Sequence, residues 1–97
     1  IVRGGENISP GEIEDVLLAH PKIIDAAVVG IPSAEWGESV AAAVSSTDKD
    51  LKEKELQELV RRTLRSSRVP EKIIFEPELP YNETGKLLRR VVRELFH

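Results

Sequence analysis

The sequence predicts a small α+β domain in which about three helices cover a three-stranded sheet, preceded by a glycine-rich loop or hairpin. Stretches with helical spacing of hydrophobic residues alternate with stretches rich in β-branched residues, in the order loop, helix, strand, strand, helix, strand, loop, helix. The 97 residues, 40% hydrophobic and 32% charged, suffice for one hydrophobic core but not for two.

The N-terminal segment predicts a loop and then a helix. Two glycines and an asparagine within residues 3–10 tolerate unusual backbone angles, which is typical of a loop. Ser9 suits an N-cap, Pro10 suits the first helical position, and Glu12 stands where a capping box requires it. The helix is expected to end before Pro21.

The middle of the chain predicts three strands and a second helix. Residues 23–31 are rich in β-branched side chains and predict a buried strand, whereas three alanines weaken the prediction of a strand over residues 39–46. Hydrophobic residues on one stripe of residues 51–65 predict an amphipathic helix. Residues 69–75 predict the third strand. Loops are expected between these elements, including one over residues 32–37.

The composition argues against several classes of function. A net charge of −3 without a basic block does not favour binding to nucleic acid or to a membrane surface. No apolar run reaches the length of about 18 residues that a transmembrane helix needs. Cysteine is absent and only His20 and His97 carry imidazoles, so we expect no metal site from this chain alone. The absence of cysteine is compatible with the cytoplasm, where we expect the protein to be located.

Lys86 is the first candidate for chemistry. A loop is expected before it and a helix from about this position onward, with Arg89 and Arg90 one turn later. Cations near a helix N-terminus are unfavourable by about 0.3–1 kcal/mol each, so an anion bound there would explain them, and Gly85 would let the backbone approach it. The alternative is a solvated loop, with the arginines facing water and pairing with Glu94.

The glycine-rich segment and the single tryptophan form a second candidate. The paired Gly4 and Gly5 suit a backbone that passes close to a ligand, and they equally suit a flexible hairpin in which they serve only the turn. Trp36 lies in an expected loop, which favours a platform for a ligand or another domain over a place in the core. Neither candidate is a complete active site.

Three motifs occur in a fixed order along nearly the whole chain. Residues 3–10 read Arg-Gly-Gly-Glu-Asn-Ile-Ser-Pro and are followed by Glu-Ile-Glu at residues 12–14. Residues 28–32 and 36–38 read Val-Val-Gly-Ile-Pro and Trp-Gly-Glu. Residues 80–89 contain a proline, four residues, Gly-Lys, two residues and an arginine. Together these motifs resemble the C-terminal domain of the adenylate-forming superfamily of acyl-CoA synthetases, adenylation domains and firefly luciferase.

The resemblance implies that residues 1–97 are the single, mobile C-terminal domain of a larger enzyme whose N-terminal domain is absent. The start at Ile1 without methionine is interpreted as a cut within a longer polypeptide. The complete enzyme would be an ATP-dependent acyl-CoA synthetase, a fatty or aryl acid–CoA ligase that forms an acyl-AMP intermediate. It would use a small carboxylic acid, ATP, Mg²⁺ and CoA. This chain alone would bind none of them and would be inactive.

The resemblance also implies roles for individual residues. Lys86 would be the catalytic residue of the first step, with Gly85 and Arg89 near the reacting phosphate. After rotation of the domain, a second group would face the active site and help to form the CoA tunnel: Gly4, Gly5, Glu6, Asn7, Trp36 and Arg68. Acetylation of Lys86 by a lysine acetyltransferase, reversed by a deacetylase, would remove the charge that the first step needs.

One departure from the family pattern keeps alternatives open. Many CoA ligases carry an aromatic residue immediately before the proline that corresponds to Pro70, and this chain has none there. Arg68 is nevertheless present to meet a CoA phosphate. The protein is therefore interpreted as a CoA ligase or, alternatively, as an aryl-acid adenylation enzyme that loads a carrier-protein thiol. A non-catalytic interaction module that kept the fold is a third reading, and Lys86 after Gly85 argues against it.

Overall fold

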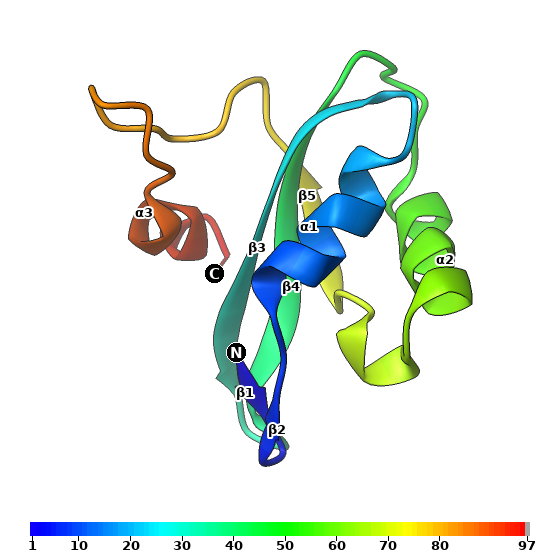
Figure 1. The fold of residues 1–97 in the computed structure, drawn as a ribbon, viewed down its shortest axis with the longest axis vertical. Helices are drawn as coiled ribbons and strands as arrows, with labels where there is room; N and C mark the ends of the chain where they lie inside the picture. The colour runs from blue at the N-terminus through cyan, green and yellow to red at the C-terminus, as the bar shows by residue number, and fades with distance from the viewer. Residues whose placement is uncertain (97) are drawn as a thin grey trace.

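The computed structural model describes residues 1–96, which form one sheet with helices on both of its faces (Figure 1). His97, expected to be a plain terminal residue, lies outside the described part of the chain. The α+β class is confirmed. Within residues 1–96, no helix combines the length and the apolar character that crossing a membrane requires.

Two long strands form the main part of the sheet. β3 (Ile23–Ser33) and β4 (Gly37–Ser46) pair antiparallel across a three-residue turn. β5 (Lys72–Phe75) runs parallel to β4. The short strands β1 (Val2–Arg3) and β2 (Glu6–Asn7) pair with each other, and β1 also pairs with β4. β4 is therefore the central strand and β3 is an edge strand.

The sheet has five strands rather than the three that the sequence predicted. The difference arises at Gly4 and Gly5, whose φ angles of 56° and 84° form the two-residue turn of a β-hairpin. This geometry lets β1 and β2 pair, and β1 then extends the sheet at Gly37. Of the two predicted forms of the N-terminal segment, a loop or a hairpin, the structure shows the hairpin.

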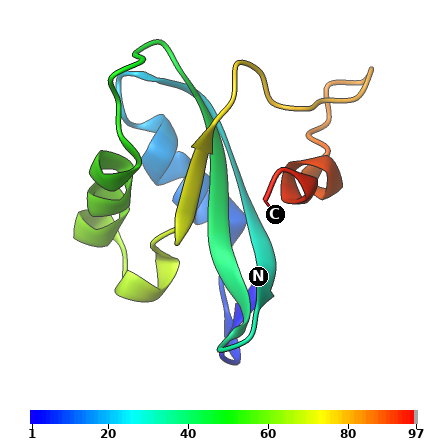
Figure 2. The ribbon, with the colours of Figure 1, turned by 180° about the vertical axis from the view of Figure 1, so that it is seen from behind.

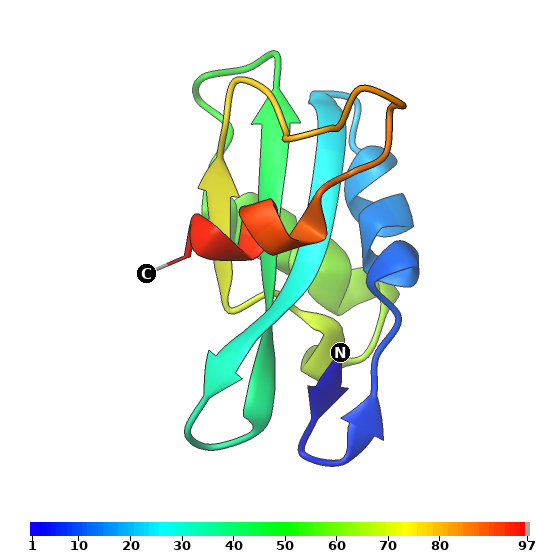
Figure 3. The ribbon, with the colours of Figure 1, turned by 90° about the vertical axis from the view of Figure 1, so that its left-hand side faces the viewer.

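Three α-helices within residues 1–96 cover the sheet unequally (Figures 2 and 3). α1 (Pro10–Leu18) and α2 (Glu53–Thr63) lie on one face, and α3 (Arg89–Glu94) lies on the other. A single 3₁₀ turn, η1 (Ser66–Arg68), leads into β5. Ser9 is the N-cap of α1, but its side chain makes no capping hydrogen bond, so the predicted capping box is not formed.

The two faces of the central strands contribute to two hydrophobic clusters. Val28 and Ala42 pack with Ile13 and Leu56 under α1 and α2, whereas alternate residues such as Val29 pack with α3. The alanines that weakened the prediction of β4 are fully buried between helices on both faces, where a small side chain fits. Burial of the strands on both faces explains why their sequences are almost continuously apolar.

The terminal helix is shorter than predicted, since α3 begins at Arg89 and Lys86 precedes it. Residues 81–87 instead form a tight turn whose ends pair in an isolated β-bridge. The side-chain oxygen of Asn82 accepts the backbone N–H groups of Thr84 and Lys86. These two N–H groups therefore take part in a turn instead of a helix. Asparagine side chains commonly compete with helix formation in this way.

Candidate functional site

The predicted site residues fall into two groups toward opposite ends of the domain (Figures 1 and 3). The N-terminal hairpin, defined as residues 2–7, lies at one end together with the β3–β4 turn. The Lys86 loop, defined as residues 80–88, lies toward the other end and leads into α3. The two groups are therefore separated along the length of the domain.

Hydrogen bonds inside the Lys86 loop fix its backbone. Asn82 Oδ1 accepts the backbone N–H groups of Thr84 at 3.0 Å and Lys86 at 2.9 Å, and also the Thr84 hydroxyl at 2.8 Å. The Asn82 N–H donates to the Lys86 carbonyl at 2.9 Å, and the Gly85 N–H donates to the Asn82 carbonyl at 3.0 Å. Gly85 has a φ of 84°, which glycine adopts without steric penalty. The backbone at Lys86 is thus held from several directions.

The Lys86 side chain is exposed on this loop. Among residues 1–96, its ammonium has no partner in a hydrogen bond or an ion pair. A Cβ atom at Gly85 would meet no atom beyond its chain neighbours within 4 Å, so the loop faces open space at this residue. The loop therefore presents an exposed cation on a hydrogen-bonded backbone to whatever approaches this end of the domain.

Both ends of the Lys86 loop are tied to the rest of the domain. The Leu88 N–H donates to the Pro80 carbonyl at 2.9 Å, which closes the loop. The Tyr81 hydroxyl donates to the carboxylate of Asp25 on β3. This hydrogen bond, with burial as a smaller cause, raises the pKa of Tyr81 to about 12.

Arg89 anchors the loop from its C-terminal side. Its guanidinium donates to Glu14 of α1, with Nη1–Oε2 at 2.7 Å and Nη2–Oε1 at 3.2 Å, and to the Val28 carbonyl of β3 at 2.8 Å. The hydrogen bond to Glu14 raises the pKa of Arg89 above its usual value. Arg89 therefore does not pair with Glu94, and its expected nearness to a phosphate stays a prediction.

Trp36 forms the support of the N-terminal hairpin. The Gly4 N–H donates to the Trp36 carbonyl at 2.8 Å, and the Arg3 guanidinium carbon lies 4.1 Å from the centroid of the indole ring, a cation–π contact. A Cβ atom at Gly4 would lie 2.8 Å from the ring carbon Cε3. Trp36 is half-buried in this contact, so it packs against the hairpin and keeps part of its ring accessible.

An ion pair joins the hairpin to η1. The Arg68 guanidinium donates to the Glu6 carboxylate and, at 2.9 Å, to Ser67 Oγ, and Arg65 lies 4.0 Å from the same carboxylate. The hydrogen bond from Arg68 lowers the pKa of Glu6 below its usual value of 4.5, which keeps it ionised at neutral pH. The fold thus unites two predicted tunnel residues that are 62 positions apart. A contact of Arg68 with CoA stays a prediction.

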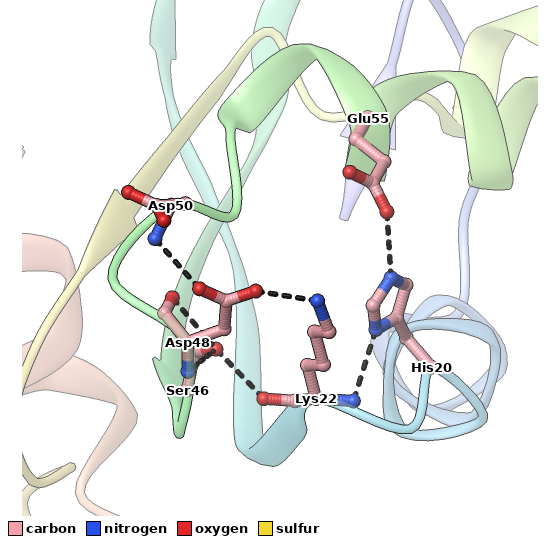
Figure 4. A network of polar contacts seen from close by, with 6 residues as sticks. All are labelled: His20, Lys22, Ser46, Asp48, Asp50 and Glu55. Carbon is pink, nitrogen blue, oxygen red and sulfur yellow. Dashed lines mark hydrogen bonds and ion pairs between the residues drawn. The ribbon is translucent and has the colours of Figure 1, made fainter.

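A polar network beside α1 and α2 ties the two helices together (Figure 4). His20 Nδ1 accepts the Lys22 N–H at 3.1 Å. Nε2 therefore carries the ring hydrogen and donates it to Glu55 Oε2 at 2.8 Å. Lys22 pairs with Asp48, and this hydrogen bond raises the pKa of Lys22 and lowers that of Asp48. His20 therefore lies just after the end of α1 and takes part in a local polar network. Residues 1–96 contain no group of three potential His, Asp or Glu metal ligands.

Two surface cavities lie away from the predicted site residues. One of about 590 Å³ is lined by apolar groups such as Leu51, Phe75 and Pro77. Another of about 420 Å³ is lined by Leu79 and by Tyr81, which lies near the start of the Lys86 loop. Neither cavity is lined by Lys86 or by the hairpin glycines. The predicted site residues therefore need a second surface to enclose a substrate.

A comparison with known families gives a match over most of the chain. The family described as AMP-binding enzyme C-terminal domain matches residues 12–86, from the first turn of α1 to Lys86. The chain belongs to this family. Its matched segment includes the Glu14 anchor and the Lys86 loop up to its lysine. Domains of this family are, by their description, the C-terminal parts of AMP-binding enzymes.

Relatives of this AMP-binding C-terminal domain are much longer proteins. It is 38% identical over 96 residues to a long-chain-fatty-acid–CoA ligase, FadD13 of Mycobacterium tuberculosis, covering 99% of the chain and 19% of the ligase. It is 44% identical over 95 residues to a 2-succinylbenzoate–CoA ligase of Bacillus mycoides, covering 98% and 20%. The solved amide bond synthetase McbA from Marinactinospora thermotolerans matches with a TM-score of 0.94 and 36% identity, covering 99% and 20%. The chain thus spans about a fifth of their length.

Sequence reasoning missed three residues that shape the site. Glu14 belonged to a recognised motif, but its partner Arg89 is 75 positions away, so no local signal could reveal the pair. Asp25 was hidden in a predicted buried strand, although a carboxylate inside such a strand is itself a signal of a specific partner. Asn82 was recognised only as a turn residue, whereas its side chain organises the whole loop.

Proposed function

We propose that this chain is the mobile C-terminal domain of an ATP-dependent acid–CoA ligase and acts with an N-terminal domain of the same polypeptide. The family supports an AMP-forming reaction, and relatives named for a fatty acid and for 2-succinylbenzoate support a carboxylic acid as the substrate. In this proposal the isolated chain is inactive, because the substrates are bound largely by the N-terminal domain.

The observation that carries the proposal is the separation of the two candidate groups. The Lys86 loop and the N-terminal hairpin lie toward opposite ends of the domain, so one orientation against a partner cannot bring both into the same active site (Figure 1). A reaction with two half-reactions can use them in turn if the domain rotates between steps.

In the first half-reaction, a carboxylate oxygen attacks the α-phosphorus of ATP, and pyrophosphate leaves to give the acyl-adenylate. Lys86 would contribute its ammonium to the negative charge shared by the carboxylate and the phosphate, with Gly85 leaving room for them. The exposed side chain and the fixed loop backbone support this role. Residues 1–96 contain no cluster of metal ligands, so we assign the Mg²⁺ that accompanies ATP to the N-terminal domain.

In the second half-reaction, the CoA sulfur attacks the acyl carbonyl and AMP leaves. The hairpin would then face the site, with Gly4 and Gly5 forming a tip that carries no side chains. The surrounding wall of the thiol tunnel would come from the remaining residues of this end of the domain: Glu6, Asn7, Trp36 and Arg68. The Glu6–Arg68 pair and the contacts of Trp36 with Arg3 and Gly4 support a preformed surface.

Substitution of Lys86 in the full-length enzyme tests the proposal. We expect Lys86→Ala to slow adenylate formation, measured by pyrophosphate exchange, by about 100-fold or more, because a preorganised charge is lost. Thioester formation from supplied acyl-adenylate should be retained. Lys54→Ala, which removes an exposed lysine of α2, is the matched control. An equal loss in both half-reactions would contradict the assignment of Lys86.

Acetylation offers a second test of the same residue. Because it removes the ammonium charge, acetylation of Lys86 by an acetyltransferase should abolish adenylate formation, and a deacetylase should restore it. Full activity with stoichiometric acetylation at Lys86 would exclude a role for its charge.

The acceptor of the acyl group has candidates other than CoA. The similarity to a solved amide bond synthetase shows that this domain type also occurs in a protein named for joining an acid to an amine. The competing acceptors are free CoA, a carrier-protein thiol and an amine. Turnover of the full-length enzyme with each, at equal acyl-adenylate formation, identifies the acceptor, and no thioester with CoA would overturn the first choice.

A further inference from the structure

Glu14 is the meeting point of three parts of the domain. Its side chain, in α1, is only 14% exposed, so its charge needs partners. Oε2 accepts the Val28 N–H of β3 at 2.8 Å and Arg89 Nη1 at 2.7 Å, and Oε1 accepts Arg89 Nη2 at 3.2 Å. Paired donors in the plane of a guanidinium fix both the distance and the orientation of Arg89.

The pair also satisfies backbone groups at one residue of the sheet's edge, Val28 of β3. β3 has β4 on one side, and its other edge would leave backbone groups without partners. At Val28, the N–H donates to Glu14 and the carbonyl accepts from Arg89 at 2.8 Å. Arg89 is therefore bound to two rigid elements at once, which restricts its backbone as well as its side chain.

Arg89 is the first residue of α3, and the Lys86 loop ends immediately before it. The loop's internal hydrogen bonds define its shape, whereas its orientation on the domain depends on its anchors. At one end the anchor is Tyr81 on Asp25, which is exposed. At the other it is Arg89 on Glu14, a bidentate pair in which the Glu14 side chain is largely buried and the Arg89 side chain is partly exposed.

We propose that the Glu14–Arg89 pair positions the Lys86 loop, and that it sets the rate of adenylate formation without touching substrate. This inference rests on the proposed function of Lys86. A lysine carried on a loop that tilts by about 1 Å loses much of its effect on the reaction, because such a displacement lowers rates by about 100-fold. The second half-reaction, in which Lys86 has no part, is not affected.

The test compares half-reactions in the full-length enzyme that carries this domain. Glu14→Gln keeps the size of the side chain and an oxygen for the Val28 N–H, but removes the charge that binds Arg89. We expect adenylate formation to fall by about 10- to 100-fold, while thioester formation from supplied acyl-adenylate changes by less than about threefold. Glu12→Gln, an equal loss of charge at an exposed site of α1, should match the wild type.

A double-mutant cycle and amide exchange separate positioning from other roles. Arg89→Gln should resemble Glu14→Gln, and the double variant should be no slower than either, since both remove one interaction. Hydrogen exchange at the Lys86 and Leu88 amides should accelerate in both variants and not in Glu12→Gln. Arg89→Lys, which keeps the charge but not the two parallel bonds, should recover only part of the rate.

Four outcomes would overturn the inference. A defect in Arg89→Gln with normal Glu14→Gln would mean that Arg89 acts on a phosphate directly. Equal loss in both half-reactions with a lowered melting temperature would reduce the pair to general support of the fold. Wild-type adenylation by Glu14→Gln, while Lys86→Ala remains selectively impaired, would refute positioning and leave the proposed function intact. If Lys86→Ala itself is not selective, the proposed function fails, and unchanged loop exchange in Glu14→Gln would refute the positioning separately.

Discussion

The Lys86 loop and the N-terminal hairpin are both tight turns with glycine at positive φ, but they are held in place differently. Inside the loop, the hydrogen bonds to Asn82 join residues no more than four positions apart. In the hairpin, the supporting contacts come from Trp36 and Arg68, far away in the sequence. The turn of the loop is shaped by contacts within it, whereas the hairpin adds contacts from distant segments to its own strand pairing.

This difference suits the two tasks that we propose. A single cation delivered to a reacting phosphate needs a stiff, local platform with firm anchors at its base. A tunnel wall needs several side chains from different segments at one end of the domain, which only tertiary packing supplies. The predictions that follow weaken one region at a time and ask whether the other is spared.

The largest effect on the hairpin side is expected from Gly4→Ala. The new Cβ would lie 2.8 Å from the Trp36 ring in a backbone with a φ of 56°, so the hairpin must shift. In the full-length enzyme, thioester formation from acyl-adenylate should fall by about 10- to 100-fold, with adenylate formation within about twofold of the wild type. Gly11→Ala, at a helical and uncrowded position, is the control. A selective loss of adenylation would reverse our assignment of the two ends.

Asn82→Ala tests the local construction of the Lys86 loop. It removes three hydrogen bonds to one side-chain oxygen, so the loop should lose its fixed shape and adenylate formation should fall by about tenfold. Asn82→Asp keeps the accepting oxygen and should retain most of the rate. Because the site is exposed, the urea midpoint should barely change. A large loss of global stability would show that the loop is not self-contained.

Tyr81 reports on the exposed anchor of the same loop. It is the only tyrosine, so the absorbance of its phenolate follows one group, which should ionise near pH 12 rather than 10. A raised folded-state pKa means that the contribution of the hydrogen bond to stability is complete below pH 10 and is lost as the pH rises toward 12. Asp25→Asn should bring the titration back toward 10. A wild-type titration near pH 10 would contradict the hydrogen bond between Tyr81 and Asp25.

The smallest effect is expected at Glu6 in the hairpin. Its pKa lies below 4.5 in the folded protein, so the pair with Arg68 is complete above that pH and is lost as the pH falls through the lowered pKa. Carboxyl carbon chemical shifts should show this titration, and Arg68→Gln should return it to about 4.5. The fluorescence of Trp36, the only tryptophan, should follow the same transition if the hairpin moves as a unit. If the Glu6 titration is the same in Arg68→Gln as in the wild type, the Glu6–Arg68 pair is disproved.

Much of the fold could be predicted because its signals are local. The periodicity in residues 51–65 predicted α2, and the β-branched run in residues 23–31 predicted β3. The length of the terminal helix was wrong, since helical spacing continues through Leu87 and Leu88 while Asn82 captures the amides of the preceding turn. The parallel pairing of β5 with β4 was not predictable from the strands alone, because either direction buries the same side chains.

The sequence by itself determined the class of the domain, its family and the turn that carries Lys86, because each depends on residues close together in the chain or on motifs in a fixed order. Only the tertiary structure decided that the hairpin joins the sheet and that Glu14 pairs with Arg89 and Glu6 with Arg68. These contacts join segments up to 75 positions apart. Their partners are chosen by the packing of helices on the sheet, which no local pattern records.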